Sequence, residues 1–136
     1  MRACFVDTWF FIAFLHEGDP HHRTAQRLAL NLSDMAFVTH DGVLAELLTF
    51  FSGYGRFWRK EVAALAHDVL ASRRYKVTPM NRDIFEDGLA LYEGRLDKEY
   101  SLVDCVSMQL MLRREITHVL TNDHHFQQEG FTLINQ

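Results

Sequence analysis

The sequence predicts an α/β domain with a mainly parallel central sheet of about five short strands flanked by helices. Two observations carry this prediction. Short apolar runs of strand length recur along the chain, and longer stretches with apolar residues at helical spacing separate them. Such alternation is typical of parallel sheets with helices on both faces, in which ligands bind beyond the carboxyl ends of the strands.

Length and composition set the outer bounds. A chain of 136 residues is a common size for one domain, so we expect a single domain over residues 1–136. Apolar residues make up 48% of the chain and charged residues 24%, which is typical of globular proteins. No apolar run approaches the roughly 20 residues that span a bilayer, and no secretion leader is recognisable. We therefore expect no membrane association and a cytoplasmic location.

Five apolar runs are the predicted strands. They cover residues 3–6, 36–39, 118–121 and 131–134, with 75–78 as a weaker fifth. Cys4 and Cys105 both lie inside apolar segments, where a reduced thiol behaves as a small core residue. Two such cysteines form no disulfide framework, which agrees with a reducing compartment.

The stretches between the strands are predicted helices. They cover residues 8–15, 21–32, 42–51, 56–73, 82–95 and 102–112. Asp19, Asp41 and Asn81 are the expected N-caps, and Pro20 is expected at the first helical position. In the third helix, one apolar stripe comprises Val43, Leu44, Leu47, Leu48 and Phe51. The segment 102–112 is apolar almost all round, so we expect it to be a buried helix.

Two aspartates follow predicted strands directly or nearly so. Asp7 ends the first strand, and Asp123 comes two residues after the strand 118–121. The carboxyl ends of parallel strands meet at one edge of the sheet, so both acids are expected there. Asp41 also follows a strand, but its expected role as a helix cap is a sufficient explanation for it.

Two further acids lie on predicted helices. Glu46 stands at the border of the apolar stripe, where acids are more often solvated than functional. Asp104 lies in an almost wholly apolar helix, where an unpaired carboxylate would be costly to bury. The spacing of Ser101 and Asp104 also fits a capping box, so a structural role and a site role are both open for Asp104.

Together these observations describe four acids that one sheet edge could gather. Four converging carboxylates would repel one another and stay ionised only if a divalent cation neutralised them. Oxygen ligands without thiolates or a histidine pair favour Mg²⁺ or Mn²⁺ over Zn²⁺.

Four sequence blocks, in order, resemble the PIN domain family, and specifically the small PIN ribonucleases that are the toxins of VapBC toxin–antitoxin pairs. The blocks are FVDTWFFIA with Asp7, VLAELLTFF with Glu46, DKEYSLVDCVSM with Asp104, and LTNDHHFQQEGF with Asp123. They span residues 5 to 131. The third and fourth blocks are the specific ones.

The resemblance implies a Rossmann-like PIN fold and metal-dependent cleavage of RNA. It implies that Asp7, Glu46, Asp104 and Asp123 form the acidic quartet, with Asp7 and Asp104 as the first choice of metal ligands. Glu46 or Asp123 would orient the attacking water or complete the shell of a Mg²⁺ or Mn²⁺ ion. Thr8 and Thr121 match positions where relatives often place a hydroxyl that supports the carboxylates. The resemblance also implies an antitoxin partner and a homodimer.

The net charge of −4 argues against a generally basic nucleic-acid-coating protein, so RNA contact would need a local surface. Residues 56–60 (RFWRK) and 73–76 (RRYK) interleave basic and aromatic residues, a combination that contacts phosphates and stacks on bases. Ordinary helix-surface arginines with aromatic residues on the inner face are the stronger explanation for these segments. The aromatic connection around residues 49–58 could instead receive a partner helix or a second subunit.

Other classes of phosphate-handling protein fit the sequence less well than a nuclease does. An aspartate-nucleophile phosphatase would need a second aspartate at position 9, which is Trp9. A receiver domain would need paired acids before the first helix and a lysine after one of the last strands, and neither feature appears. A phosphoesterase of the DHH type would need further histidine and aspartate motifs. A PIN-fold module that binds protein or RNA without catalysis remains the main alternative, and it predicts no dependence on a cation.

The triplet Asp123-His124-His125 invites a zinc-site interpretation. Adjacent side chains diverge in a helix or a strand, so the three residues are not expected to face one ion. Asp123 is the predicted site residue. His124 and His125 are expected to begin a short helix that Gly130 ends, where either could approach a phosphate without binding the metal.

Overall fold

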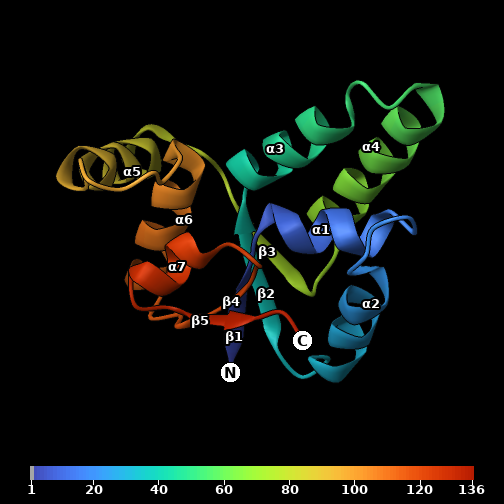
Figure 1. Cartoon of the computed structure of the whole chain (residues 1–136), viewed down its shortest axis with the longest axis horizontal. Coiled ribbons are helices and arrows are strands. Elements are labelled where there is room, and N and C mark those ends of the chain that lie inside the picture. The colour runs from blue at the N-terminus through green and yellow to red at the C-terminus, as the bar shows by residue number, and fades with distance from the viewer. Residues whose placement is uncertain (1) are drawn as a thin grey trace.

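The computed structural model describes residues 2–136, in which seven helices flank a five-stranded sheet (Figure 1). The strands are β1 (Ala3–Val6), β2 (Ala36–His40), β3 (Tyr75–Thr78), β4 (His118–Leu120) and β5 (Thr132–Ile134). The helices are α1 (Thr8–Leu15), α2 (His22–Asn31), α3 (Asp41–Phe51), α4 (Arg56–Ala71), α5 (Arg82–Gly94), α6 (Leu102–Arg113) and α7 (His124–Gln128).

The strands run parallel in the spatial order β3-β2-β1-β4-β5. At the centre, Phe5 of β1 pairs with Val38 of β2 on one side and with Val119 of β4 on the other. The chain first moves from β1 towards β3 and later crosses back to β4, so the strand order reverses at β1. Such a reversal leaves a crevice beyond the carboxyl ends of the strands. The predicted α/β fold with a mainly parallel sheet is confirmed.

The direction of each crossover decides which face of the sheet its helices cover. The connections from β1 to β2 and from β2 to β3 carry α1 to α4. The connections to β4 and β5 step the opposite way and carry α5 to α7. Because parallel crossovers are right-handed, the two groups of helices cover opposite faces, as Figure 1 shows.

The core lies along the two central strands. In β1 every residue after Ala3 is buried, and Val119 and Leu120 of β4 are buried as well. Strands covered on both faces need apolar residues at successive positions, which explains the continuous apolar runs in the sequence. The predicted buried helix is α6, and the free thiols Cys4 and Cys105 lie in the core as expected.

The predicted cap of α3 was wrong. His40, not Asp41, is the N-cap, and its Nδ1 accepts a hydrogen bond from the Gly42 N–H at 3.0 Å. The reason is that β2 is one residue longer than predicted, so its last residue occupies the cap position. Asp41 becomes the first helical residue, and its carboxylate accepts a hydrogen bond from the Met80 N–H at 3.2 Å.

The predicted start of α2 was also wrong. The Asp19 carboxylate accepts a hydrogen bond from the His21 N–H at 2.8 Å, and the Asp19 carbonyl accepts one from the His22 N–H at 3.0 Å. These bonds close a turn that contains Pro20, so the helix begins only at His22. The predicted Asn81 cap of α5 is confirmed by its hydrogen bond from the Ile84 N–H at 3.0 Å.

The apolar stripe of α3 is buried except at Leu48, which is 38% exposed. Within residues 2–136, no helix combines the length and the apolar character needed to cross a membrane.

Candidate active site

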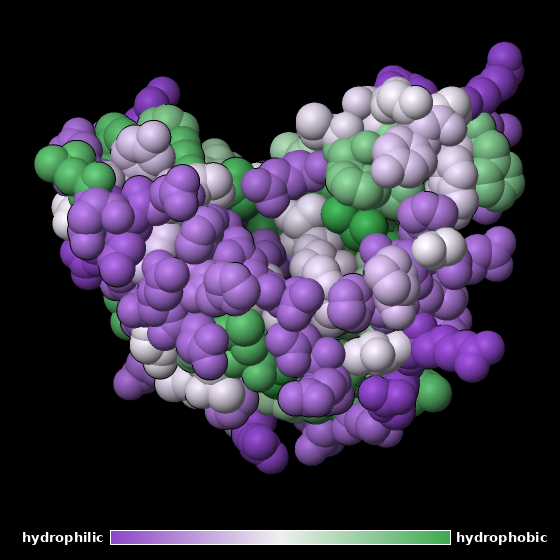
Figure 2. Space-filling view, in the orientation of Figure 1, coloured by the Kyte–Doolittle hydropathy of each residue, from purple (hydrophilic) through white to green (hydrophobic). Residues whose placement is uncertain are grey.

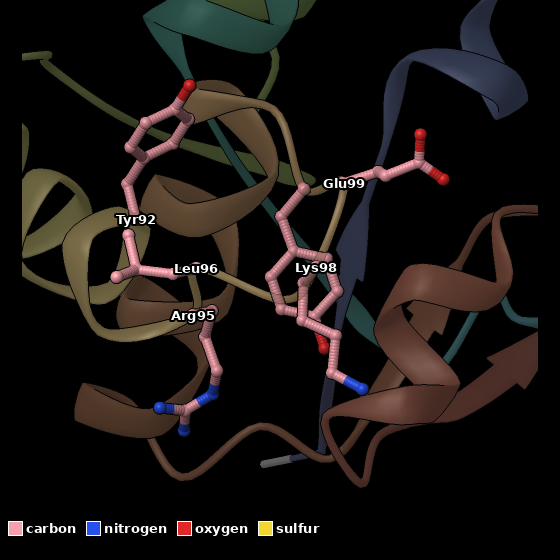
Figure 3. Close-up of a pocket in the computed structure, with 6 residues that line it drawn as sticks. Tyr92, Arg95, Leu96, Lys98 and Glu99 are labelled. Atoms are coloured by element: carbon pink, nitrogen blue, oxygen red, sulfur yellow. The ribbon is translucent and has the colours of Figure 1, made fainter.

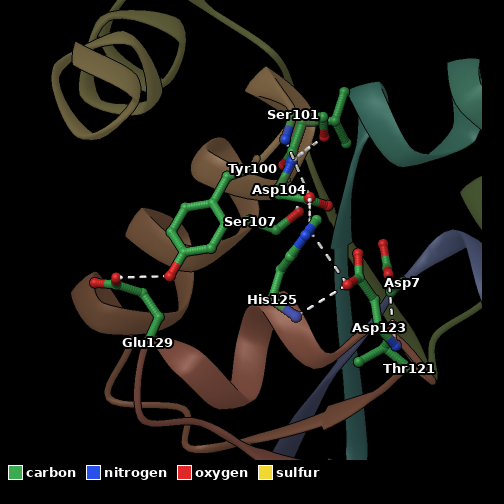
Figure 4. Close-up of polar contacts among 10 residues, drawn as sticks. Asp7, Tyr100, Ser101, Asp104, Ser107, Thr121, Asp123, His125 and Glu129 are labelled. Atoms are coloured by element: carbon green, nitrogen blue, oxygen red, sulfur yellow. Dashed lines mark hydrogen bonds and ion pairs between the residues drawn. The ribbon is translucent and has the colours of Figure 1, made fainter. Parts of the chain in front are cut away.

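The four predicted acids reach the carboxyl edge of the sheet from four separate elements. Asp7 follows β1, Asp123 follows β4, Glu46 lies in the second turn of α3, and Asp104 lies in the first turn of α6. Figure 4 shows Asp104 and Asp123 directed towards His125, with Asp7 beside Asp123. Segments that are distant in sequence therefore supply carboxylates to one edge of the sheet.

Asp7 is the most buried of the four acids, with 6% of its surface exposed. Thr121 Oγ1 donates a hydrogen bond to Asp7 Oδ2 over 2.7 Å. The pKa of Asp7 is raised to about 7. Burial is the largest cause, the charges of Asp104 and Glu46 add to it, and the hydrogen bond from Thr121 opposes it. The ionised form of Asp7 is therefore disfavoured unless a positive charge approaches it.

Glu46 is half-buried and is fixed by the first residue of α1. Thr8 Oγ1 donates a hydrogen bond to Glu46 Oε1 over 2.5 Å. Burial raises the pKa of Glu46; the bond from Thr8 lowers it, and the charges of Asp104 and Asp123 raise it. The expectation that hydroxyls at positions 8 and 121 support the carboxylates is confirmed.

Asp104 serves as both a helix cap and a member of the acidic group. Its Oδ2 accepts a hydrogen bond from the Ser101 N–H at 3.1 Å, and Ser101 Oγ accepts one from the Asp104 N–H at 3.0 Å. The same Oδ2 lies 3.3 Å from His125 Nδ1. Burial raises the pKa of Asp104; the Ser101 amide and His125 lower it, and the charge of Asp123 raises it. The capping box thus holds the acid on the first turn of α6, facing the crevice.

Asp123 caps α7 and holds His125 beside the acids. Asp123 Oδ1 accepts a hydrogen bond from the His125 N–H at 2.9 Å and lies 3.3 Å from His125 Nδ1. Among residues 2–136, Asp104, Asp123 and His125 form the group whose potential ligand atoms all lie within 4.8 Å of one another. Asp7 and Glu46 stand outside that group, and His124 is exposed.

The sequence expectation treated His124 and His125 alike, whereas the structure places only His125 beside the acids. The signal was present in the spacing. An N-cap aspartate accepts a hydrogen bond from the backbone N–H two or three positions further on, so His125 was a candidate partner of Asp123. Asp123 and His125 have this relationship in α7.

A second layer of contacts lies behind His125. The ring of Tyr100 lies 5.4 Å from the His125 ring, between centroids, and Tyr100 Oη donates a hydrogen bond to Glu129 Oε1 at 3.0 Å. Arg95 binds both oxygens of Glu129 through Nε and Nη2, each at 2.9 Å. Tyr100 and Arg95 also line a pocket of about 280 Å³ next to the site (Figure 3). The connection between α5 and α6 is thereby fastened to the end of α7.

An open groove runs alongside the acids. It has a volume of about 510 Å³, and its lining includes Thr8 and Glu46 together with Ala45, Phe50 and Val103. Figure 2 shows the molecule hollowed between the part formed by α3 and α4 and the part formed by α5 to α7. A polymer could therefore lie across the molecule with one of its bonds close to the carboxylates.

The two basic and aromatic segments have different surroundings. In residues 73–76, Arg74 donates hydrogen bonds to the carbonyls of Ala29 and Leu32 at 2.9 and 2.7 Å, and its guanidinium lies 3.9 Å from the ring centroid of Phe37. The charged group of Arg74 therefore holds α2 against the sheet, which favours the structural explanation for this segment. In residues 56–60, Phe57 is 63% exposed.

The donor set fits a divalent cation. Carboxylate oxygens and one imidazole nitrogen are ligands for such ions, and a cation would offset the desolvation and mutual repulsion that raise the pKa values of Asp7, Glu46 and Asp104. The site can therefore concentrate positive charge beside the groove.

Comparisons with known proteins agree with this geometry. A model of the PIN domain family matches residues 4–131. The 23S rRNA-specific endonuclease VapC20 of Mycobacterium tuberculosis is 29% identical over 127 residues, which is 93% of this chain and 94% of the relative. The crystal structure of VapC20, described as a sarcin-ricin loop cleaving toxin, superimposes with a TM-score of 0.85 at 26% identity, covering 98% of this chain and all of that one.

The structure of FitAcB from Neisseria gonorrhoeae is a more distant match. It has a TM-score of 0.63 at 16% identity, and covers 97% of this chain and 96% of that one. At this identity the likeness concerns the fold alone.

Proposed function

Because the chain belongs to the PIN domain family, we propose that it is a Mg²⁺- or Mn²⁺-dependent endoribonuclease and the toxin of a toxin–antitoxin pair. The observation that supports the proposal is that four carboxylates from four distant segments lie near enough for their charges to act on one another, with raised pKa values at Asp7, Glu46 and Asp104. The likeness to VapC20 over nearly the whole chain supports the assignment as a nuclease and as a toxin.

In the proposed reaction, Asp7 and Asp104 hold the cation, and Glu46 or Asp123 orients the attacking water or completes the shell of the cation. When bound, the cation would activate that water and neutralise charge on the phosphate oxygens. Thr121 and Thr8 fix the orientations of Asp7 and Glu46 through their hydrogen bonds. The protein contributes the positions of the reacting groups and electrostatic stabilisation, because no side chain needs to become covalently attached to RNA.

The RNA would lie in the groove beside Glu46, where the lining is largely apolar and can contact bases and sugars. VapC20 is described as specific for 23S rRNA, so ribosomal RNA that carries the sarcin-ricin loop is the first substrate to test. A chain with net charge −4 gains little from general attraction to RNA, so recognition of a folded shape is favoured over binding along any strand.

The test is cleavage of purified ribosomal RNA by the purified chain, with end mapping. We expect cleavage at one or a few positions in Mg²⁺ or Mn²⁺ and none in a chelator. Direct attack by water leaves linear phosphate ends, whereas attack by the ribose 2′-hydroxyl leaves a cyclic phosphate. Cleavage that persists in chelator, or that leaves cyclic phosphate ends, would contradict the proposal.

We also propose a protein partner and a homodimer in the cytoplasm, with residues 1–136 as one PIN domain. Phe50 at the end of α3, Tyr54 in the connection and Phe57 at the start of α4 are 41%, 47% and 63% exposed. Exposed aromatic surface of this kind favours a protein contact. Sedimentation of the purified chain measures the dimer, and a monomer at micromolar concentration would contradict it.

A further inference from the structure

The second histidine of the triplet occupies the place of a ligand in the candidate site. His125 Nδ1 lies 3.3 Å from both Asp104 Oδ2 and Asp123 Oδ1. A typical N–H···O hydrogen bond is about 2.9 Å long, so both distances are longer than those of a typical hydrogen bond. Neighbouring ligands at right angles around an ion, each about 2.1 Å from it, stand roughly 3.0 Å apart. The nitrogen is therefore placed with respect to both carboxylates much as a third ligand would be.

The imidazole is held in this place from two directions. The backbone N–H of His125 is bound to Asp123 Oδ1, which fixes the start of α7. The buried Tyr100 packs its ring against the imidazole and is itself anchored by Glu129. A side chain whose position is already fixed by its neighbours loses little conformational freedom when it binds an ion.

We propose that His125 Nδ1 is a direct metal ligand and that it makes this site prefer Mn²⁺ over Mg²⁺. The inference deepens the proposed function and rests on it. Mg²⁺ binds oxygen ligands and keeps much of its water, whereas imidazole nitrogen binds transition-metal ions well. A site made of carboxylates alone discriminates weakly between the two ions. Replacing one oxygen with nitrogen weakens Mg²⁺ more than Mn²⁺.

The test uses the intact chain loaded with Mn²⁺ and pulsed electron paramagnetic resonance, which detects nitrogen bound directly to the ion. Wild type should show a nitrogen coupling. His125→Asp should keep bound Mn²⁺ and lose the coupling. The matched control His124→Asp, which makes the same chemical change at an exposed neighbour, should retain it.

Competition between the ions gives a second readout. The ratio of the dissociation constants for Mg²⁺ and Mn²⁺ should fall about tenfold or more in His125→Asp and stay unchanged in His124→Asp, because only the first change restores an all-oxygen site. His125→Asn, which keeps a similar size without an imidazole, should lose the coupling as well and guards against a folding defect in the aspartate variant.

The outcomes separate the two proposals. Bound Mn²⁺ without nitrogen coupling in wild type, or an unchanged ratio in His125→Asp, would overturn the role of His125 and leave the metal-dependent nuclease standing. Wild-type protein that binds no Mn²⁺ at all would contradict the proposed function and this inference together.

Discussion

Thr121 and Asp7 are 114 positions apart in the chain, yet the Thr121 hydroxyl donates a 2.7 Å hydrogen bond to the Asp7 carboxylate in the buried junction between β4 and β1. The same oxygen of Thr121 accepts a hydrogen bond from the Asp123 N–H at 3.2 Å. One hydroxyl therefore links two of the four acids. It does so at the point where the strand order reverses.

Removing this hydroxyl should impair the site without removing an acid. Thr121→Val keeps the shape of the side chain but leaves Asp7 and the Asp123 amide without their shared partner. Groups that orient metal ligands are typically worth about 10- to 100-fold in affinity or activity, so we expect a loss of that size in Mn²⁺ affinity. Calorimetry measures it. Thr121→Ser, which retains the hydroxyl, should recover most of the affinity, and equal affinities in Thr121→Val and wild type would refute the role.

Asp7 should lower stability in the absence of a cation. Its pKa is raised from 3.8 to about 7, so the unfolded state releases its proton first and the folded state loses relative stability as the pH rises between these values. Above pH 7 the penalty is complete. Asp7→Asn should therefore be more stable than wild type at pH 8 in chelator, on the order of 2 to 4 kcal/mol by urea unfolding. A less stable variant under these conditions would be inconsistent with the buried charge.

Added Mn²⁺ should reverse this order. An ion that binds only the folded state raises the unfolding midpoint of wild type, and Asp7→Asn, which lacks one proposed ligand, should respond much less. Equal shifts of the unfolding midpoint in both proteins would show that Asp7 is not a metal ligand.

The contribution of His40 to stability should depend on pH in the opposite direction and increase as the pH rises. Its pKa is lowered from 6.5 to about 4 by burial, so the unfolded state binds a proton that the folded state excludes. The stability contributed by neutral His40 is complete above pH 6.5 and is lost as the pH falls towards 4. Its full size is on the order of 3 kcal/mol.

The comparison of wild type with His40→Asn isolates this contribution from that of the acids. Asparagine can still cap α3, because its side-chain oxygen can replace Nδ1 as the acceptor for Gly42. The stability of wild type relative to the variant should rise between pH 4 and 6.5 and then level off. A difference that does not vary with pH would rule out a buried neutral histidine.

Gly88 sets the approach of α5 to α6, the helix that carries Asp104. A Cβ atom at this position would lie 2.3 Å from Val106 Cγ2 and 3.1 Å from the Val106 backbone nitrogen. Gly88→Ala should therefore destabilise the protein by about 1 to 3 kcal/mol, since backbone atoms cannot move aside. Gly94→Ala, on the same helix with nothing within 4 Å of the added Cβ, is the matched control and should not destabilise it in a urea titration.

Much of the fold could be predicted because its local signals agree with its global arrangement. The bounds of β1 and β3 match the predicted strands, since each is a short apolar run between elements of different character. The parallel arrangement followed from the alternation of strands and helices. The caps predicted at Asp19 and Asp41 were wrong because an aspartate before a helix can close a turn or enter the first turn as readily as cap it.

The site could be predicted in part for a similar reason. Parallel strands place the residues that follow them at one edge, so Asp7 and Asp123 were accessible to sequence reasoning. The sequence left a capping role and a site role open for Asp104, and the structure combines them, because one carboxylate oxygen serves the capping box and faces His125 at the same time. The contact of Arg74 with α2 could not be predicted, because it depends on carbonyl groups more than 40 positions away.

The central claim is that RNA is hydrolysed at the acidic group, and single-turnover RNA cleavage by Asp104→Asn tests it most directly. Asparagine can still accept the Ser101 N–H, so the helix cap survives. Asp41→Asn is the matched control, because Asp41 lies at the same sheet edge but is exposed and bound to Met80. We predict at least about a hundredfold loss for Asp104→Asn, from the several kcal/mol that a metal site supplies, and near-wild-type cleavage for Asp41→Asn. Wild-type cleavage by a folded Asp104→Asn protein would contradict the account.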